Sequence, residues 1–294
     1  LYVIPTVAGV SPLTGPPGTT VTITGTGLSD VTTVRMGPPG AGPDGLNPQA
    51  NAAGTQLTFQ VPVDAVSGTL ELLAGPNAVT TTQAFVAVPV LRQPPNDFAT
   101  AGQSITFQGI NLDNASSLTI NGVSSPITAS TSTSVTVTVP ATATTGMVTV
   151  TTPAGQGTFA QPYGVGATIT GFAPAEAAPG ATVTVTGTGF SDGSLSGLNS
   201  VFSVQAGDCD MPSTFTVVSA TQLTFVVPAD ACTGAAVRLG GPGSPVGPGT
   251  FVVLPTISSF APASGPVGAV VSVTVTGNTN VATAAFAFNG VAAT

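Results

Sequence analysis

The sequence predicts an all-β protein built from tandem two-sheet sandwiches that follow one another in an elongated array. Three observations lead to this prediction. The composition is rich in Thr, Val, Ala, Gly and Pro, apolar and hydroxyl side chains alternate along short segments, and one phrase recurs every 78 to 90 residues. Threonine and valine suit half-buried pleated surfaces, whereas Gly and Pro suit tight turns.

The composition also excludes several classes of function. The 294 residues are 42% hydrophobic, enough for two or more domains with real cores, but only 5% are charged, against a usual ~25%. The net charge is −8, and the only basic residues are Arg35, Arg92 and Arg238, so no basic patch can bind nucleic acid. No stretch reaches the ~18 apolar residues of a spanning helix, which predicts no membrane insertion within this stretch.

The first marker of the repeat is an alternating strand that ends in glycine. It reads VTITGTGLSD at 21–30, ITFQGINLDN at 105–114, VTVTGTGFSD at 183–192 and VTVTGNTNVA at 273–282. We expect its glycine to be a structural turn, with a positive φ or a bulge at the sheet edge. The four glycines are Gly25, Gly109, Gly187 and Gly277.

Two further markers follow in a fixed order. A Val-Pro pair precedes a second glycine by six residues, and an aromatic segment such as FVAVP or FVVLP closes the repeat. We expect these second glycines, Gly68, Gly146 and Gly234, to be structural turns as well. Val21 and Ile23 alternate with threonines, which places one face of each strand on a core and the other in solvent. About seven short strands per repeat is the number typical of an immunoglobulin-like sandwich.

The combined phrase resembles the IPT/TIG family (immunoglobulin-like, plexins, transcription factors). Three repeats match it, at 5–88, 89–166 and 167–254, and a partial fourth occupies 255–294. The resemblance implies tandem modules of a bacterial-type surface or secreted protein, or accessory modules of polysaccharide-acting enzymes. Family members that contact DNA use basic loops, which this chain lacks.

The two ends of the sequence fall out of phase with the repeat. LYVI at 1–4 reads as the last strand of a preceding module, and the fourth repeat stops before its Val-Pro marker. Two explanations stand: the sequence is a window on a longer array, or the ends complete one another between subunits by strand addition.

The two cysteines, Cys209 and Cys232, both lie in the third repeat. A pair within one module of a secreted chain indicates a disulfide. Free thiols and a metal site are the alternatives. A catalytic pair is disfavoured, because the chain has no C-x-x-C motif and no histidine.

The other candidates for chemistry are few. The carboxylates are scattered, so we expect no catalytic residue, no bound metal and no cofactor. Asp30 and Asp192 follow the glycine turns and should bond their own backbone, with calcium at a module junction as the alternative. Asn114 begins the sequence N-A-S, a possible glycosylation site, although O-linked sugar on the Ser/Thr run 128–134 is the better candidate. Long loops at 35–51 and 191–213 are either binding loops or tolerated insertions.

These features predict a structural extracellular protein and no enzyme. Its tandem sandwiches would form a cell-surface fibre, filament or stalk, a homopolymer assembled head to tail or by strand addition. Its partners would be other copies of itself. Burial against those copies, or glycans on the many Ser and Thr hydroxyls, would also explain a mean hydropathy of +0.47 in a chain with so few charges. The alternative is an adhesin or polysaccharide-binding module array with glycan partners.

Overall fold

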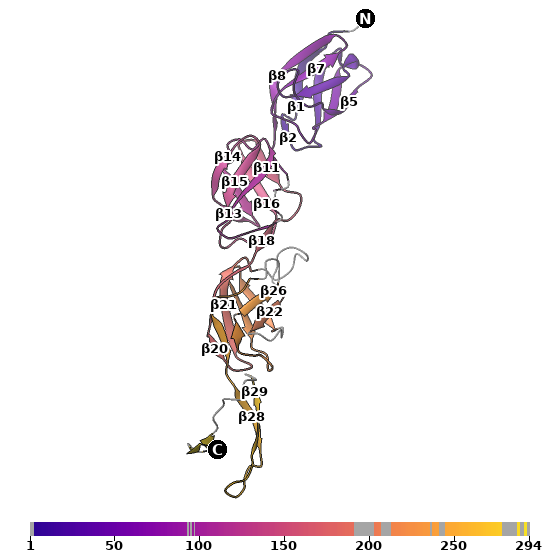
Figure 1. Ribbon diagram of the computed structural model, residues 1–294. Helices are drawn as coiled ribbons and strands as arrows, with labels where there is room; N and C mark the ends of the chain where they lie inside the picture. Colours follow the sequence, from indigo (N-terminus) through magenta and orange to yellow (C-terminus); the bar gives the residue numbers. More distant parts are fainter. Residues whose placement is uncertain are drawn as a thin grey trace. The chain divides into compact units, whose positions relative to one another are not determined.

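The computed structural model describes residues 3–92, 94, 96, 98–190, 203–206, 213–235, 237–240, 245–277, 287–288 and 291–292. Nearly all regular structure among them is β-strand, which confirms the all-β prediction, and the one helical segment they contain is the 3-10 turn η1 (Leu28–Asp30). No helix in this described part is both long enough and apolar enough to span a membrane. The chain divides into two compact units, 1–97 with 104–138 and 147–162, and 98–103 with 139–146 and 163–294. Figure 1 labels many of the strands that follow.

The first repeat is a sandwich of two four-stranded sheets within the first unit. One sheet has the order β1-β3-β6-β5, and the other has the order β2-β8-β7-β4. The strands are β1 (Thr6–Ser11), β2 (Thr14–Gly15), β3 (Thr20–Thr26), β4 (Thr33–Met36), β5 (Leu46–Ala50), β6 (Gln56–Gln60), β7 (Gly68–Ala74) and β8 (Asn77–Ala87).

The core of this repeat lies between its two sheets. Val21 and Ile23 of β3 are fully buried, and they share one cluster with Leu70 and Leu72 of β7 from the other sheet. The intervening residues of β3 are threonines that face outward, as the alternation predicts. Strand β5 is a correction, because the sequence predicted only a long loop over 35–51.

The second repeat contributes two more four-stranded sheets to the first unit. Their orders are β14-β15-β11-β9 and β13-β12-β16-β17. The strands are β9 (Val90–Leu91), β11 (Ser104–Ile110), β12 (Ser117–Ile120), β13 (Val123–Ser125), β14 (Ile127–Ser130), β15 (Ser134–Thr138), β16 (Val148–Thr152) and β17 (Gly155–Thr158). Strand β12 turns directly into β13 through Asn121 and Gly122, which both have positive φ.

The second unit begins with the parallel pair β10 (Phe98–Thr100) and β18 (Gly164–Gly166) and continues into the third repeat. The third repeat has sheets in the orders β19-β21-β24-β23, β20-β27-β25 and β22-β26 around a single core cluster. Its strands are β19 (Thr168–Ala173), β20 (Glu176–Ala177), β21 (Thr182–Thr188), β22 (Ser203–Ala206), β23 (Phe215–Ser219), β24 (Gln222–Val226), β25 (Gly234–Ala235), β26 (Val237–Gly240) and β27 (Thr250–Val253).

Two hairpin-like pairs complete the described part of the second unit. Strands β28 (Thr256–Ala261) and β29 (Ser272–Thr276) pair with each other, as do β30 (Ala287–Phe288) and β31 (Val291–Ala292). The β28–β29 pair repeats the register of β1–β3 and β19–β21, including its bulge. The same bulged start is therefore built three times, and β9 paired with β11 is the shorter counterpart in the second repeat, which agrees with the predicted tandem sandwiches.

Candidate functional site

The first glycine of the phrase lies inside a strand and not in a turn, contrary to the expectation for Gly25, Gly109 and Gly187. These residues belong to β3, β11 and β21, and none of them has a positive φ. A Cβ at each would overlap a backbone carbonyl oxygen of the neighbouring strand, that of Thr6, Val90 or Thr168. Glycine is required here because another backbone comes too close for a side chain.

The close approach coincides with a β-bulge in two of these repeats. Strand β1 shifts register between Val7 and Gly9, and Val7 pairs with Gly25. Strand β19 shifts between Ile169 and Gly171, and Ile169 pairs with Gly187. The sequence predicted either a positive φ or a bulge at the strand glycine, and at Gly25 and Gly187 the structure has a bulge in the neighbouring strand. A bulge bends that strand toward the glycine, which explains the close approach.

Gly277 occupies a different position from the other three glycines. Thr276 pairs with Thr256 in the same register as Thr26 with Thr6, so Gly277 is the counterpart of Gly27. The residue opposite the bulge in this fourth repeat is Val275. The sequence alignment of Gly277 with Gly25 was therefore wrong by two residues.

The positive φ falls two residues after the strand position that is held by glycine in three repeats and by Val275 in the fourth, at the point where each repeat meets the segment before it. The four residues there are Gly27 (φ 68°), Asn111 (φ 55°), Gly189 (φ 69°) and Gly277 (φ 79°). The left-handed conformation favours Gly and, next, Asn. We call these four residues the junction residues.

Each junction residue lies against the backbone carbonyl of the residue that precedes its own repeat. A Cβ at Gly27, Gly189 or Gly277 would lie 3.3, 2.5 or 2.8 Å from the carbonyl oxygen of Ile4, Gly166 or Leu254. In the second repeat the Asn111 side-chain amide reaches the equivalent carbonyl and donates to Val88 O at 3.3 Å. The four junctions therefore share one geometry with two different residues.

Two junctions also contact the link after the Val-Pro marker of the preceding repeat. Asn111 Nδ2 donates to Ala65 O at 2.9 Å, and Gly277 N donates to Ala229 O at 3.2 Å. At the first junction the Asp30 carboxylate accepts from Val3 N at 2.9 Å. Asp30 thus bonds a residue 27 positions away and not its own turn, which corrects the sequence interpretation.

The second glycines of the repeat pair with its closing aromatic residue. Gly68 pairs with Phe85, Gly146 with Tyr163, and Gly234 with Phe251. All three aromatic side chains are buried. Gly68 and Gly234 are the first residues of strands β7 and β25, so the prediction that they are turn residues was wrong. A glycine opposite a large aromatic ring is a known pairing in sheets.

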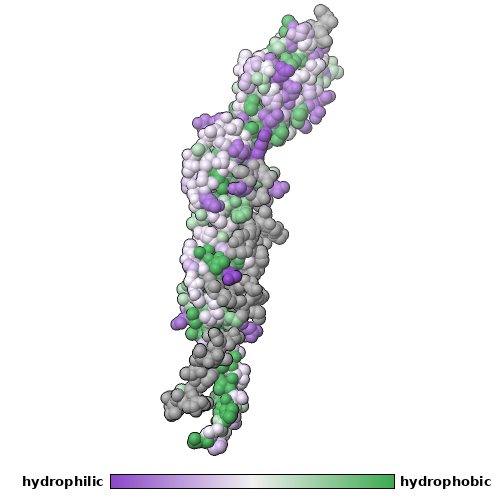
Figure 2. Space-filling view, viewed as in Figure 1, coloured by the Kyte–Doolittle hydropathy of each residue, from purple (hydrophilic) through white to green (hydrophobic). Residues whose placement is uncertain are grey.

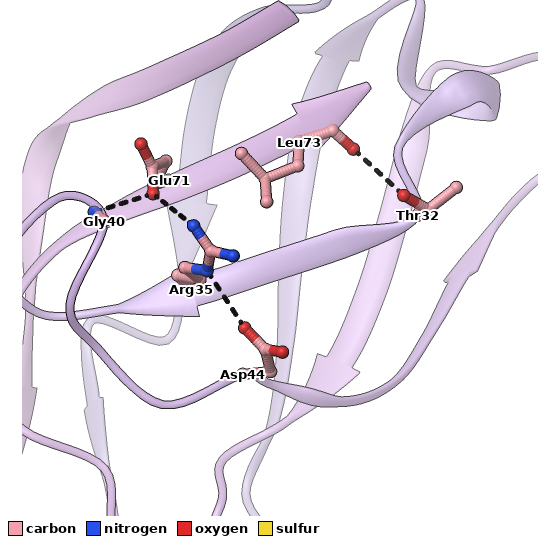
Figure 3. A network of polar contacts seen from close by, with 6 residues as sticks. All are labelled: Thr32, Arg35, Gly40, Asp44, Glu71 and Leu73. Carbon is pink, nitrogen blue, oxygen red and sulfur yellow. Dashed lines mark hydrogen bonds and ion pairs between the residues drawn. The ribbon is translucent and has the colours of Figure 1, made fainter. Parts of the chain in front are cut away.

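A charged cluster holds the loop between β4 and β5 of the first repeat (Figure 3). Arg35 lies between two carboxylates, with Nε 3.3 Å from Asp44 Oδ1 and Nη1 3.5 Å from Glu71 Oε2. Glu71 Oε2 also accepts from Gly40 N at the tip of the loop, at 3.0 Å. The Glu71 side chain is 12% exposed and that of Asp44 is 61% exposed, so Glu71 is the anchor of the cluster.

The backbone of this loop is folded back on the strands that it connects. Met36 N donates to Pro43 O and Gly45 N donates to Val34 O. A Cβ at Gly42 would overlap the Met36 carbonyl, and one at Gly45 would lie 2.5 Å from the Phe59 ring. The loop is thus specified by its own residues, which the sequence reading as a tolerated insertion or binding loop did not anticipate.

The remaining predicted site residues either lie outside the described residues or make few contacts. Cys209, Asp192 and most of the loop at 191–213 lie outside the described residues, so the pairing of Cys209 with Cys232 stays a prediction. Asn114 is exposed in a turn with φ 53°, and Ser116 of its sequon donates to Thr151 O. Within the described residues, no three His, Cys, Asp or Glu side chains gather as a metal site.

Solved structures with similar folds include surface and extracellular proteins. A protein solved with a xylogluco-oligosaccharide is 16% identical over 82% of this chain and 58% of its own, with a TM-score of 0.31. A surface glycan-binding protein from Prevotella bryantii is 17% identical over 56% of this chain and 42% of its own (TM-score 0.34). The plexin A4 extracellular region is 18% identical over 76% and 21% (TM-score 0.25).

The chain spans from about a fifth to somewhat more than half of the length of these three structures. Identities and TM-scores in this range carry no information on ligand or activity. No curated protein matches the sequence significantly.

The family comparison agrees with the repeat that the structure shows. The model of the IPT/TIG domain matches three times, at residues 5–85, 93–164 and 167–253. The first and third matches run from the bulged opening pair to the closing aromatic strand, and the second begins just after β9 and ends after Tyr163. The chain therefore belongs to the IPT/TIG domain family.

Proposed function

We propose that this chain is a structural, non-catalytic segment of an extracellular or cell-surface protein, in which IPT/TIG modules are joined through ordered junctions. The proposal rests on one recurring contact. In four successive repeats the junction residue lies against the backbone carbonyl of the residue that precedes the repeat. A structural array needs each module to be held by its neighbour. A recurring contact at the point of connection supplies that restraint.

The junction of the first two repeats shows how the restraint works. Pro89 follows Val88 directly, and its ring fixes one backbone dihedral of the connection. Asn111 Nδ2 then ties the connection to the preceding link through Val88 O and Ala65 O. A Cβ at Gly157 would overlap the Pro89 carbonyl, so β17 also lies close to the connection. These contacts leave little freedom for a hinge.

The test measures order across this junction. Spin labels are attached through a non-natural amino acid at Thr80 of the first repeat and Thr128 of the second, both exposed. We expect one narrow distance distribution, which broadens at least twofold in Asn111→Gly, because glycine keeps the left-handed φ and removes the amide. The matched control is Asn47→Gly, another left-handed asparagine (φ 52°), at an exposed site in the first repeat. A broad distribution in the unmodified chain would contradict the proposal.

Assembly with other copies is a further part of the proposal. The chain has few charges for its apolar content, with 5% charged residues and a mean hydropathy of +0.47. A surface with so few charges favours association with other copies. We expect concentration-dependent association in sedimentation velocity and ordered fibres by negative-stain microscopy. A single species at all concentrations would contradict homopolymer formation and leave the junction proposal standing.

A second candidate function is glycan binding. It is favoured by the outward face of one sheet in each repeat, which presents hydroxyl and carboxamide side chains and no charge. Such groups are the usual polar partners of neutral ligands. Retention of the full chain on immobilised neutral polysaccharides would test this function.

A further inference from the structure

The outward faces of three sheets share a composition that the core does not require. These sheets are β1-β3-β6-β5, β14-β15-β11-β9 and β19-β21-β24-β23, one in each complete repeat. None of their strands contains Asp, Glu, Lys or Arg. In the first repeat the charged cluster of Arg35 and Glu71 belongs to the other sheet.

A pair of threonines directly opposite each other marks the centre of each face. The pairs are Thr22 with Thr58, Thr106 with Thr136, and Thr184 with Thr224. All six side chains are half-buried, and their strand neighbours on either side are buried core residues. The pairs therefore point away from the core at equivalent places in the three repeats.

The rest of each face continues the same chemistry. In the first repeat, Ser11 and Gln49 extend the Thr22–Thr58 row to the sheet edges. In the third repeat, Thr216 extends the Thr184–Thr224 row. Outward residues two apart on a strand are separated by about 7 Å, and neighbouring strands by about 4.8 Å. In the second repeat Ala129 lies opposite Thr136, and exposed Leu46 and Val226 lie on the faces of the first and third repeats. Each face is thus mainly a surface of hydroxyl and carboxamide groups with a few apolar side chains, and we call it the hydroxyl face.

We propose that the hydroxyl faces bind a neutral polysaccharide. This inference rests on glycan binding, the second function proposed above, and assigns it to particular residues. Hydroxyl and carboxamide groups each offer a donor and an acceptor, which matches a polymer whose own surface consists of hydroxyl groups. A chain with a net charge of −8 repels an acidic polysaccharide, whereas an uncharged face is indifferent to salt.

Two features favour a sugar polymer over a second copy of this chain. Protein interfaces are enriched in aromatic residues and Met at their centres and depleted in Ser. Around the central pairs the outward positions of these faces instead hold mainly Thr, Ser and Gln, with Ala129, Ala173 and Val226 as apolar members and no aromatic ring. Much of the described surface in Figure 2 is pale, the colour of residues that are neither strongly hydrophilic nor strongly hydrophobic.

The repetition of the face sets the expected strength of binding. A face without aromatic rings lacks the stacking that gives most glycan sites their affinity, so each face binds weakly. A long polymer can meet more than one face of the same chain, and each further contact is then intramolecular. We therefore expect tight retention on long polymers and no measurable affinity for short oligosaccharides.

The experiment uses the full chain in depletion assays with microcrystalline cellulose and insoluble β-glucan, and with alginate as the acidic comparison. We expect saturable binding to at least one neutral polymer, insensitive to salt. The face variant replaces the three central pairs with Val, which has nearly the same shape and favours strands. Its substitutions are Thr22→Val, Thr58→Val, Thr106→Val, Thr136→Val, Thr184→Val and Thr224→Val.

The matched control carries six equal substitutions at exposed or half-buried threonines outside the hydroxyl faces. They are Thr33→Val, Thr69→Val, Thr119→Val, Thr149→Val, Thr151→Val and Thr250→Val. We expect at least a tenfold higher dissociation constant in the face variant and less than a twofold change in the control. Circular dichroism and thermal unfolding verify that both variants fold.

The outcomes separate the inference from the function beneath it. Binding that the face variant retains, or that both variants lose equally, overturns the hydroxyl faces as the site and leaves glycan binding in place. No binding of the unmodified chain to any neutral polymer overturns both. A face variant that binds normally but no longer self-associates assigns the faces to contacts between copies and overturns the inference.

Discussion

The first and second repeats share one fold, and they differ most usefully in their junction residues and in one connection between strands. Their junction residues are Gly27 and Asn111, and their connections after the fourth strand of the fold are a clamped loop at 37–45 and the two-residue turn Asn121–Gly122. Both repeats keep the strand glycine, Gly25 or Gly109, where no side chain fits. The comparison shows that the backbone conformation is kept in both repeats. The residue type changes only where another residue can adopt that conformation, as asparagine does at the junction.

The largest effect is expected at the glycines that both repeats share. Gly25→Ala and Gly109→Ala would place a methyl group on the carbonyl oxygen of Thr6 or Val90. Because a backbone atom cannot move as a side chain does, we expect each repeat to lose about 3 kcal/mol or more of stability. Hydrogen exchange measured repeat by repeat by mass spectrometry would detect the loss.

The control for these variants is Gly9→Ala, also in a strand of the first repeat. A Cβ there would lie 3.3 Å from the Thr24 hydroxyl, which can rotate away. We expect a change within about 0.5 kcal/mol. Equal effects of Gly9→Ala and Gly25→Ala would show that close backbone approach is not the cause.

The next effect distinguishes the loop of the first repeat from the turn of the second. Glu71→Ala removes the acceptor of Gly40 N–H and one partner of Arg35, at a site where the carboxylate is mostly buried. We expect a loss of about 2 kcal/mol and faster exchange over 37–45. Asp44→Ala, at the exposed end of the same cluster, should cost less than about 0.5 kcal/mol. A larger effect of Asp44→Ala would reverse the assignment of the anchor.

A smaller effect is expected at the turn of the second repeat. Asn121 and Gly122 have φ of 47° and 79°, the combination that a tight hairpin of this type needs. Asn121→Ala should cost about 1 kcal/mol, because alanine tolerates the left-handed region poorly. Asn121→Gly should restore most of the loss, and thermal unfolding of the two variants side by side would measure the difference.

Local pattern was sufficient to predict the parts of the fold that depend on period and composition. The alternation around Val21 and Ile23 predicted which side chains are buried, because successive residues of a strand face opposite sides. The sequence also marked the second glycine and the closing aromatic segment of each repeat, but it did not predict that these residues pair with each other. The Asn-Gly pair at 121–122 was a usable turn signal that the sequence reading did not draw upon.

The position of Gly277 shows where pattern fails. An alternating Thr-Val strand looks the same after a slip of two residues, since such a slip keeps every side chain on its original face. The register is fixed by the bulge in β28 that follows the Ile257–Val275 pair. A bulge is a property of two paired strands, so it cannot be seen in the pattern of one strand. The junction contacts escaped prediction for the same reason, because Asn111 and Ala65 are 46 residues apart in sequence.

The smallest effect would convert one junction into the other. Gly27→Asn introduces at the first junction the residue that the second repeat uses, and asparagine accepts the φ of 68°. Its Cβ would meet the end of the Val3 side chain at 2.9 Å and the Ile4 carbonyl at 3.3 Å, so only a flexible group must move. We expect a change within about 0.5 kcal/mol for Gly27→Asn and a loss of about 1 kcal/mol for Gly27→Ala, measured by thermal unfolding. Equal losses would show that the two junctions are not interchangeable and that the amide of Asn111 has a role specific to the second repeat.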